Sequence, residues 1–288
     1  MPELTLWGGP VDGLRLHYLA AGTGPPVLLI HGLGGFAESW RHNLPALARQ
    51  AAVVSVDLPG FGHSSKPPGP YHLSRFVEAL DGFIGSLELG RTSLIGHSLG
   101  GAVAVAYALA RPERVERLVL IGAVVPGFDY RASVVCRVLA TPNVGELLGW
   151  LLGPGMLRFA LSRCFAAPDA GEVDFLVQNS ARVWGSPEGR AAFLATLRGV
   201  GQDFLNEGQR YQEWIRNFDR PVLSIHGRQD PVVSLRHAEL VAHALPNATL
   251  RVLDRCGHFP QIEHAAIVNR WLGEFIGEIR WSRSPRRG

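Results

Sequence analysis

The sequence predicts an α/β fold, in which a mostly parallel sheet carries helices on both faces and one helical segment is inserted between two late strands. Apolar strand-like runs alternate with helical segments up to about residue 125, and again from residue 221 to residue 276. This alternation is typical of parallel sheets whose strands are connected by helices. The stretch between the two regions, residues 126–219, has apolar pairs at helical spacing and few strand signals. It is therefore expected to be a helical cap inserted after the sixth strand.

The predicted strands are short apolar runs that differ in their exposure. Residues 14–20 alternate apolar and polar side chains, as in a half-exposed strand, whereas residues 27–30 are apolar throughout, as in a strand covered on both faces. Eight strands are expected, at residues 4–7, 14–20, 27–30, 52–57, 93–96, 117–123, 221–227 and 249–254.

The predicted helices are recognised by spacing and by their ends. Ser74 can cap a helix that runs to about Leu87, with apolar residues three and four apart. Pro112 ends a helix of small residues at 98–110. Two more helices are expected at 234–244 and 261–276. The predicted organisation is a core of residues 1–125 and 220–279, the cap 126–219, and a basic, disordered tail 280–288.

Composition and charge exclude several classes of protein. The chain has 28 Lys and Arg against 25 Asp and Glu, but four of the arginines lie in the tail. The remaining 24 basic residues do not cluster, so no nucleic-acid partner is predicted. No apolar run reaches 18 residues, which predicts no membrane span. The N-terminus lacks the features of a signal peptide, so a cytoplasmic location is expected.

The cysteines do not indicate a metal site or a disulfide framework. There are three of them, Cys136, Cys164 and Cys256, and no two have metal-ligand spacing. They are expected to be reduced, buried thiols. Neither a metal nor an organic cofactor is predicted, and the sequence predicts no particular oligomeric state.

A candidate nucleophile lies in the motif G-x-S-x-G at residues 96–100. A strand leads into Ser98 and a helix rich in Ala and Gly follows it, which is the context that this motif requires. The turn is tight, and Gly96, Gly100 and Gly101 relieve the crowding that bulky neighbours would cause. The arrangement predicts that the Ser98 hydroxyl stands clear of the sheet at a helix N-terminus.

A candidate oxyanion hole follows the strand at 27–30. Residues 31–35 read His-Gly-Leu-Gly-Gly, and glycines let the backbone come close to a substrate. The backbone N–H groups of Leu33 and Leu99 are the expected donors to a tetrahedral intermediate, each contributing roughly 3 kcal/mol. His31 is expected to brace this loop rather than to transfer protons.

The chain has eleven histidines, of which His258 is the expected general base, because it follows the strand 249–254 through a turn that contains glycine. Functional residues of open α/β sheets collect at the C-terminal ends of strands. Asp230 lies three residues after another strand and can orient the His258 ring. Asp254 and Asp129 are the alternative acids. The other histidines are expected elsewhere: His226 inside a strand, His97 pointing away from Ser98, and His237, His243 and His264 on helix surfaces.

These motifs together resemble the α/β-hydrolase superfamily over nearly the whole chain. The matching pieces are HGLGG at 31–35, DLPGFGHS at 57–64, GHSLGG at 96–101, HGRQDP at 226–231 and CGHFPQIE at 256–263. The resemblance implies the α/β-hydrolase fold, with a mostly parallel eight-stranded sheet flanked by helices and a helical cap inserted after strand 6. Ser98 stands where haloalkane dehalogenases and epoxide hydrolases of this shape carry Asp, so those activities are disfavoured.

The activity that the resemblance favours is a carboxylesterase acting on a small-molecule ester through an acyl-enzyme on Ser98. Trp150, Phe159, Trp184 and Phe259 are candidate pocket residues. The alternative is a C–C bond hydrolase of aromatic degradation. Such enzymes usually have Gly-Pro-Gly in the oxyanion loop and Trp after the catalytic His, where this chain has residues 34–36 (Gly-Gly-Phe) and Phe259. Perhydrolase or acyltransferase side activity is also compatible, whereas a non-catalytic binding protein is disfavoured because all three triad residues are present.

Overall fold

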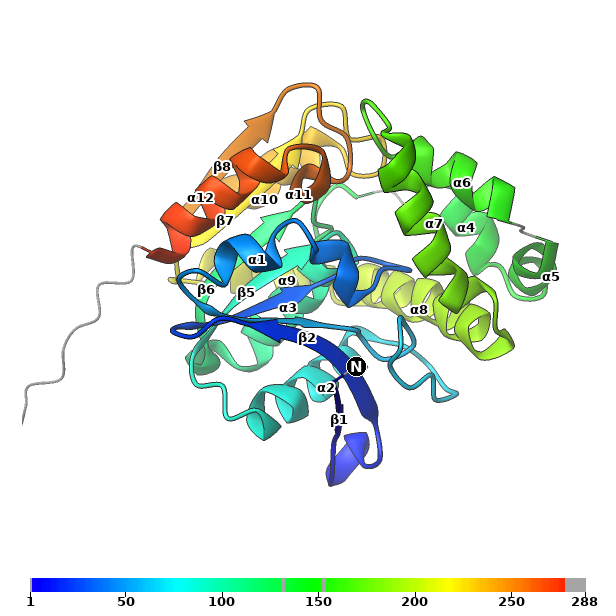
Figure 1. The fold of residues 1–288 in the computed structure, drawn as a ribbon, viewed down its shortest axis with the longest axis horizontal. Helices are drawn as coiled ribbons and strands as arrows, with labels where there is room; N and C mark the ends of the chain where they lie inside the picture. The colour runs from blue at the N-terminus through cyan, green and yellow to red at the C-terminus, as the bar shows by residue number, and fades with distance from the viewer. Residues whose placement is uncertain (1, 131–132, 152–153, 278–288) are drawn as a thin grey trace, which may run out of the picture.

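The centre of the molecule is one sheet, which Figure 1 shows surrounded by helices. The computed structural model describes residues 2–130, 133–151 and 154–277. The strand order is β1-β2-β4-β3-β5-β6-β7-β8. The pairs β1–β2 and β2–β4 are antiparallel and the other neighbours are parallel. The predicted class, a mostly parallel eight-stranded sheet flanked by helices, is confirmed. The strands are β1 (Glu3–Thr5), β2 (Arg15–Ala21), β3 (Pro26–Ile30), β4 (Ala52–Val56), β5 (Thr92–His97), β6 (Val115–Ile121), β7 (Val222–Gly227) and β8 (Ala248–Leu253).

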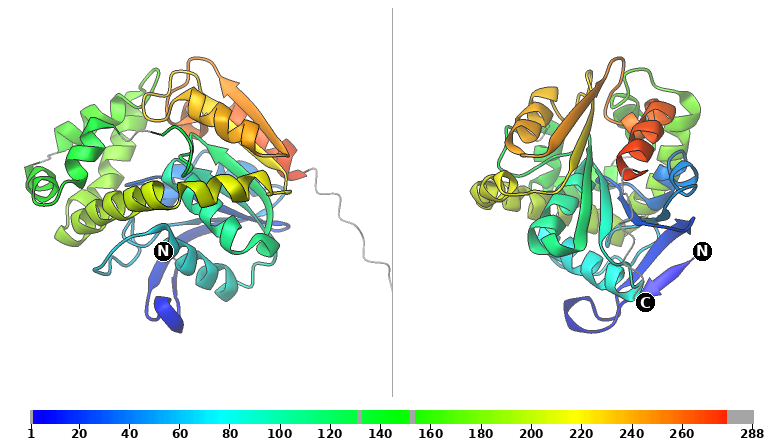
Figure 2. Two further views of the ribbon diagram at one scale, coloured as in Figure 1. Left: turned by 180° about the vertical axis from the view of Figure 1, so that it is seen from behind. Right: turned by 90° about the vertical axis from the view of Figure 1, so that its left-hand side faces the viewer.

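Helices cover both faces of this sheet, as Figure 2 shows in its right-hand view. Alternate residues of each strand point to opposite faces, so Leu28 and Ile30 of β3 join one apolar cluster while Val27 and Leu29 join another. The first cluster includes α2 (Leu73–Ser86), α3 (Leu99–Ala110) and α10 (Leu235–Ala244), and the second includes α1 (Leu44–Leu47) and α12 (Ala265–Gly277).

The chain between β6 and β7 is helical and contains no strand among its described residues. Figure 1 shows α4 to α7 grouped on one side of the sheet, with α8 running beneath them. We call residues 126–219 the cap; the division of the chain at these two residues stays a prediction. The cap helices are α4 (Val134–Ala140), α5 (Val144–Leu151), α6 (Pro154–Ser162), α7 (Ala170–Trp184), α8 (Pro187–Asn206) and α9 (Gly208–Arg216).

A third, smaller apolar cluster joins the cap to the core. Phe165 and Leu176 of the cap pack there with Phe36 and Ile262 of the core. The Arg41 guanidinium lies over the Phe175 ring of α7 at 3.5 Å from its centroid. This part of the cap therefore has an apolar contact area of its own with the core.

The last predicted helix is divided in two. Sequence spacing predicts one helix over 261–276, but α11 (Pro260–Glu263) ends before α12 begins at Ala265. His264 has φ −129° and ψ 42°, which lies outside the helical region. The tail 280–288 lies outside the described residues. No helix in the described part of the chain combines the length and apolar character needed to cross a bilayer.

Candidate active site

Ser98 stands at a sharp turn between β5 and α3, where its backbone has φ 52° and ψ −118°. Residues other than glycine rarely adopt a positive φ, so this conformation is strained and depends on the structure around it. The Ser98 N–H donates a 3.0 Å hydrogen bond to the carbonyl oxygen of Ile121 on β6. A Cβ on Gly96 would lie 2.5 Å from the carbonyl carbon of Gly100. The turn can therefore close only because glycine occupies this position.

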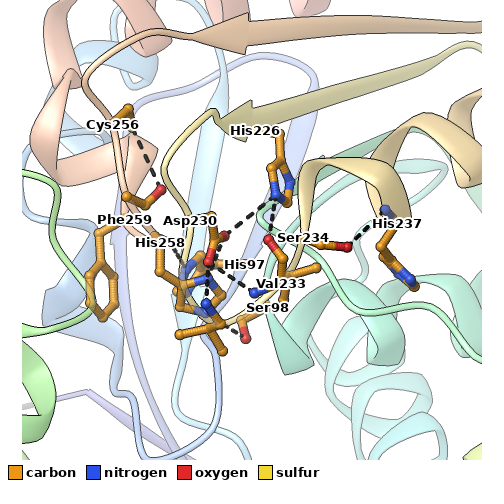
Figure 3. A network of polar contacts seen from close by, with 12 residues as sticks. His97, Ser98, His226, Asp230, Val233, Ser234, His237, Cys256, His258 and Phe259 are labelled. Carbon is orange, nitrogen blue, oxygen red and sulfur yellow. Dashed lines mark hydrogen bonds and ion pairs between the residues drawn. The ribbon is translucent and has the colours of Figure 1, made fainter. Parts of the chain in front are cut away.

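The imidazole of His258 lies between Ser98 and Asp230, as Figure 3 shows. Its Nε2 is 3.0 Å from Ser98 Oγ, and its Nδ1 is 2.8 Å from Asp230 Oδ2. The other oxygen of Asp230 accepts the N–H groups of Val232 and Val233 at 2.8 and 2.9 Å. Because the Nδ1–H group donates its hydrogen bond to the carboxylate, the proton of the neutral ring stays on Nδ1, and Nε2 is left to accept the Ser98 hydroxyl proton.

Asp230 is held in its charged form. Burial by itself would raise the pKa of Asp230, but the charge and hydrogen bond of His258 outweigh it, and the pKa lies below its ordinary value. His226 Nε2 lies 3.6 Å from the same oxygen, Oδ2, and donates a 2.9 Å hydrogen bond to the carbonyl of Val233. The charged Asp230 carboxylate can therefore stabilise an imidazolium on His258.

The loop after β3 approaches Ser98 closely. A Cβ on Gly32 would lie 3.1 Å from Ser98 Cβ. The N–H of Leu33 donates no hydrogen bond to another described residue. Leu99 is the first residue of α3, so its N–H has no partner within the helix. Both N–H groups lack a partner among the described residues, and their role as an oxyanion hole stays a prediction.

His31 braces this loop in the way the sequence predicts. Its Nδ1 donates a 2.7 Å hydrogen bond to the carbonyl of Gly32, and its Nε2 accepts the N–H of Leu58 at 3.0 Å. An Nε2 that accepts a hydrogen bond carries no proton, so the ring is neutral. Burial lowers the pKa of His31 accordingly. The loop is therefore tied to the segment after β4 by a neutral histidine.

One histidine has a neighbour that the sequence did not indicate, and another lies elsewhere than predicted. The ring centroid of His97 is 4.9 Å from that of His258 (Figure 3), whereas its expected direction away from Ser98 stays a prediction. His237, expected at a helix surface, is completely buried, and its Nε2 accepts the N–H of Val125 at 3.1 Å. A polar residue on a short helix is typical of an exposed position. The face of α10 that carries His237, however, packs against the segment that follows β6.

The four candidate pocket residues have different surroundings. Phe259 follows His258 and stacks at 5.2 Å from the ring of His97. Trp184 packs at 4.6 Å against Phe193, whose ring carbon would lie 3.2 Å from a Cβ on Gly34 in the oxyanion loop. Phe159 is 68% exposed on α6. The side chain of Trp150 lies outside the described residues, so its role stays a prediction.

The alternative acids and the thiol groups of the cysteines are not part of the contacts between Ser98, His258 and Asp230. Asp254 pairs with Arg228 at the surface, and Asp129 lies 3.9 Å from Arg236. All three cysteines are free; Cys256 is buried as expected, whereas Cys136 and Cys164 are only partly buried. The sequence therefore selects the one Asp that reaches His258.

Comparison with known proteins identifies the family of this chain. A family model described as the alpha/beta hydrolase family matches residues 27–271. A 2-hydroxymuconate semialdehyde hydrolase of Pseudomonas putida is 33% identical over 269 residues, which cover 92% of each chain. A 2-hydroxy-6-oxo-2,4-heptadienoate hydrolase of Pseudomonas putida is 30% identical, covering 92% of this chain and 93% of the relative. Among solved structures, a meta-cleavage product hydrolase from Pseudomonas fluorescens has a TM-score of 0.75 and 30% identity, covering 92% of this chain and 95% of that one.

Proposed function

This chain belongs to the alpha/beta hydrolase family, and on that premise we propose that it hydrolyses a C–C bond in linear dienoates of the meta-cleavage type. The observation that carries the hydrolase chemistry is the contact of His258 Nε2 with Ser98 Oγ at 3.0 Å, together with that of Nδ1 with Asp230 at 2.8 Å. The choice of a C–C bond is supported by relatives at least 30% identical over 92% of the chain, which are named as hydrolases of such compounds.

The first step would be addition of Ser98 to the ketone carbonyl of the substrate. His258 takes the hydroxyl proton, and Asp230 stabilises the imidazolium that forms. The negative charge that develops on the former carbonyl oxygen is stabilised by the N–H groups of Leu33 and Leu99. Up to this point an ester and a ketone require the same nucleophile, base and oxyanion donors.

The second step separates the two classes of substrate, because the leaving group of a ketone is a carbanion. In a 2-hydroxy-6-oxo-2,4-dienoate the bond between C5 and C6 must break, and a vinyl anion at C5 would have no delocalisation. Transfer of the proton from the C2 hydroxyl to C5 gives the keto tautomer. Collapse of the Ser98 adduct then breaks the C5–C6 bond and leaves the acyl group on Ser98, and the departing dienolate, whose charge extends to the oxygen on C2, takes the proton held by His258. The neutral His258 then activates water, which releases the carboxylic acid from Ser98.

A carboxylic ester hydrolase is the second candidate function, and two features of the sequence favour it. Residues 34–36 read Gly-Gly-Phe and Phe259 follows His258, where C–C hydrolases usually have Gly-Pro-Gly and Trp. These two departures from the usual C–C hydrolase pattern favour the esterase. Similarity over 92% of the chain supports the C–C hydrolase more strongly, because the relatives named as hydrolases of 2-hydroxymuconate semialdehyde and of 2-hydroxy-6-oxo-2,4-heptadienoate match most of the chain.

One parallel assay tests the choice. Wild type and Ser98→Ala are given 2-hydroxy-6-oxohepta-2,4-dienoate, followed by the loss of its dienoate absorbance, and p-nitrophenyl acetate and butyrate, followed by nitrophenolate release. We expect the wild type to cleave the dienoate with a kcat/KM at least about tenfold above that for either ester. Mass spectrometry should then find acetate and a five-carbon 2-hydroxydienoate. Rapid ester hydrolysis without loss of the dienoate would assign the esterase instead.

A further inference from the structure

The segment that carries the base, residues 256–259, is held from one side by a single carboxylate. We call this segment the histidine loop. Glu263, the last residue of α11, accepts the N–H of Gly257 at 2.9 Å and that of Phe259 at 3.2 Å through Oε1. These two N–H groups flank His258. The backbone on either side of the base is therefore bonded to one side chain.

The same carboxylate also bonds the cap. Glu263 Oε2 accepts the N–H of Ala166 at 2.9 Å, and it is 3.1 Å from the Gly257 nitrogen. Ala166 lies in the cap corner, by which we mean residues 164–166 between α6 and α7. One side chain therefore links the base-carrying loop to the element expected to cover the substrate.

The cap corner and the histidine loop also touch directly. The N–H of His258 donates a 2.7 Å hydrogen bond to the carbonyl of Cys164. A Cβ on Gly257 would lie 2.7 Å from the nitrogen of Ala166, so this backbone approach is possible only for glycine. The rings of Phe165 and Phe259 stack with centroids 4.9 Å apart.

We propose that Glu263 is a positioning residue, which sets the place of the His258 ring by holding the histidine loop and the cap corner together. The His258 ring must satisfy two contacts at once, 3.0 Å to Ser98 and 2.8 Å to Asp230. A shift of about 1 Å in such a group can lower a rate by about 100-fold. Without the carboxylate, the N–H groups of Gly257, Phe259 and Ala166 lose their shared acceptor, and the loop relaxes to find others.

This inference rests on the proposed function only in taking Ser98 as nucleophile and His258 as its base. It is therefore tested with a reagent that needs no knowledge of the substrate. A fluorophosphonate reacts with an activated serine, and intact-mass spectrometry gives the rate of Ser98 modification. All variants are compared at a temperature where circular dichroism shows them fully folded.

Three variants separate the positioning role from simple stability. Glu263→Ala removes all acceptors, and we expect labelling about 10- to 100-fold slower than in wild type. Glu263→Gln keeps one oxygen for Gly257 and Phe259 but presents N–H groups to Ala166, so we expect a smaller loss of about three- to tenfold. Glu274→Gln, on α12 and paired with Arg251, is the matched control and should label at the wild-type rate.

A second readout reports directly on the base. In wild type the Nδ1 proton of His258, bonded to Asp230, should give a downfield proton NMR resonance. We expect it to broaden through exchange with water in Glu263→Ala and to persist in Glu274→Gln. A residue that served stability alone would change neither the labelling rate nor this resonance in folded protein.

The outcomes are distinct. Labelling of both Glu263 variants within twofold of wild type would overturn the proposal, and if Glu263→Ala does not fold, Glu263→Gln alone decides on the same threshold. A wild type that is not labelled at Ser98 would overturn the nucleophile and this role with it. A labelled wild type that leaves the dienoate intact would overturn only the proposed substrate.

Discussion

The Nε2 of His97 donates a 2.8 Å hydrogen bond to the backbone carbonyl of His258. The residue that precedes the nucleophile on β5 thus holds the backbone of the base, 161 positions away in the chain. This bond is made to a carbonyl group of the histidine loop, whereas Glu263 accepts from N–H groups of the same loop. Burial, and then the charge of His258, lower the pKa of His97 to about 3, so the ring is neutral wherever the protein is folded at ordinary pH.

The neutral state of His97 predicts that the folded protein loses stability at acidic pH. An unfolded His97 binds a proton below about pH 6.5, whereas the folded one does not until about pH 3. The unfolded chain therefore binds more protons in this window, and the free energy of unfolding falls as pH is lowered through it, with no dependence above it. At pH 5 the loss from this one residue is about 2 kcal/mol.

Urea denaturation at pH 7.5, 6.0 and 5.0 measures this effect. His97→Gln, which cannot become charged, should lose less stability between pH 7.5 and 5.0 than wild type does. His243→Gln serves as control because His243 is exposed on α10. Equal pH slopes for wild type and His97→Gln would contradict the buried, neutral histidine.

The acid of the triad can be tested without disturbing the fold. Asp230→Asn keeps the shape of the side chain, but its amide can meet His258 with an N–H instead of an acceptor oxygen and so favours the wrong ring tautomer. We expect kcat to fall by about 10⁴-fold with KM little changed. Asp254→Asn, at an exposed position, should retain wild-type kcat. Steady-state kinetics on whichever substrate the parallel assay identifies would decide, and similar losses in both variants would remove the special role of Asp230.

The closeness of the oxyanion loop to the nucleophile predicts a large effect of one methyl group. In Gly32→Ala the new Cβ would lie 3.0 Å from His97 Nδ1 and 3.1 Å from Ser98 Cβ, so the loop must move. We expect kcat to fall by about 10- to 1000-fold because the donors lose their alignment.

A second glycine provides the control for this substitution. Gly201 lies in the interior of α8, and a Cβ there would meet nothing within 4 Å. Gly201→Ala should keep wild-type kcat and raise the free energy of unfolding by about 0.5–1 kcal/mol. An unimpaired Gly32→Ala would show that the loop is not used as proposed.

Two phenylalanines of the cap should differ sharply in their effect on stability. Phe165 is 7% exposed and lies in the cluster between cap and core, whereas Phe159 is 68% exposed. Phe165→Ala is expected to lower the free energy of unfolding by about 3–5 kcal/mol. Phe159→Ala is expected to stay within about 0.5 kcal/mol of wild type. Chemical denaturation measures both, and equal values would mean that the cluster does not attach the cap.

The elements of the core were predictable because their local patterns agree with their tertiary environment. The run at 27–30 is apolar throughout, and β3 is indeed paired on both sides, with β4 and with β5. The break between α11 and α12 was not predictable, because His264 fits the helical spacing and only its backbone angles interrupt it. The packing of the six cap helices also depends on contacts between them that no local pattern encodes.

The meeting of Ser98, Asp230 and His258 could be predicted from the sequence because each of them follows a strand of a parallel sheet, and such strands end at one edge. The roles of the residues that support them could not be predicted in this way. Glu263 and His97 act on backbone groups, and nothing in their own sequence positions indicates which N–H or carbonyl they will meet. The CGHFPQIE motif includes Glu263, but only the structure reveals its three N–H partners.

The strained backbone of Ser98 and its long separation from its partners have a consequence for biosynthesis. The sheet pairs β5 with β3 and with β6, and Asp230 and His258 come from the last quarter of the chain. A ribosome has therefore made the strands around the nucleophile long before it makes the base and the acid. Because domains complete folding only as their last elements emerge, the nascent chain should carry an unreactive serine. The hydrolase activity of the protein then appears in one step, when β8 pairs with β7 at the edge of the sheet and the histidine loop contacts the cap.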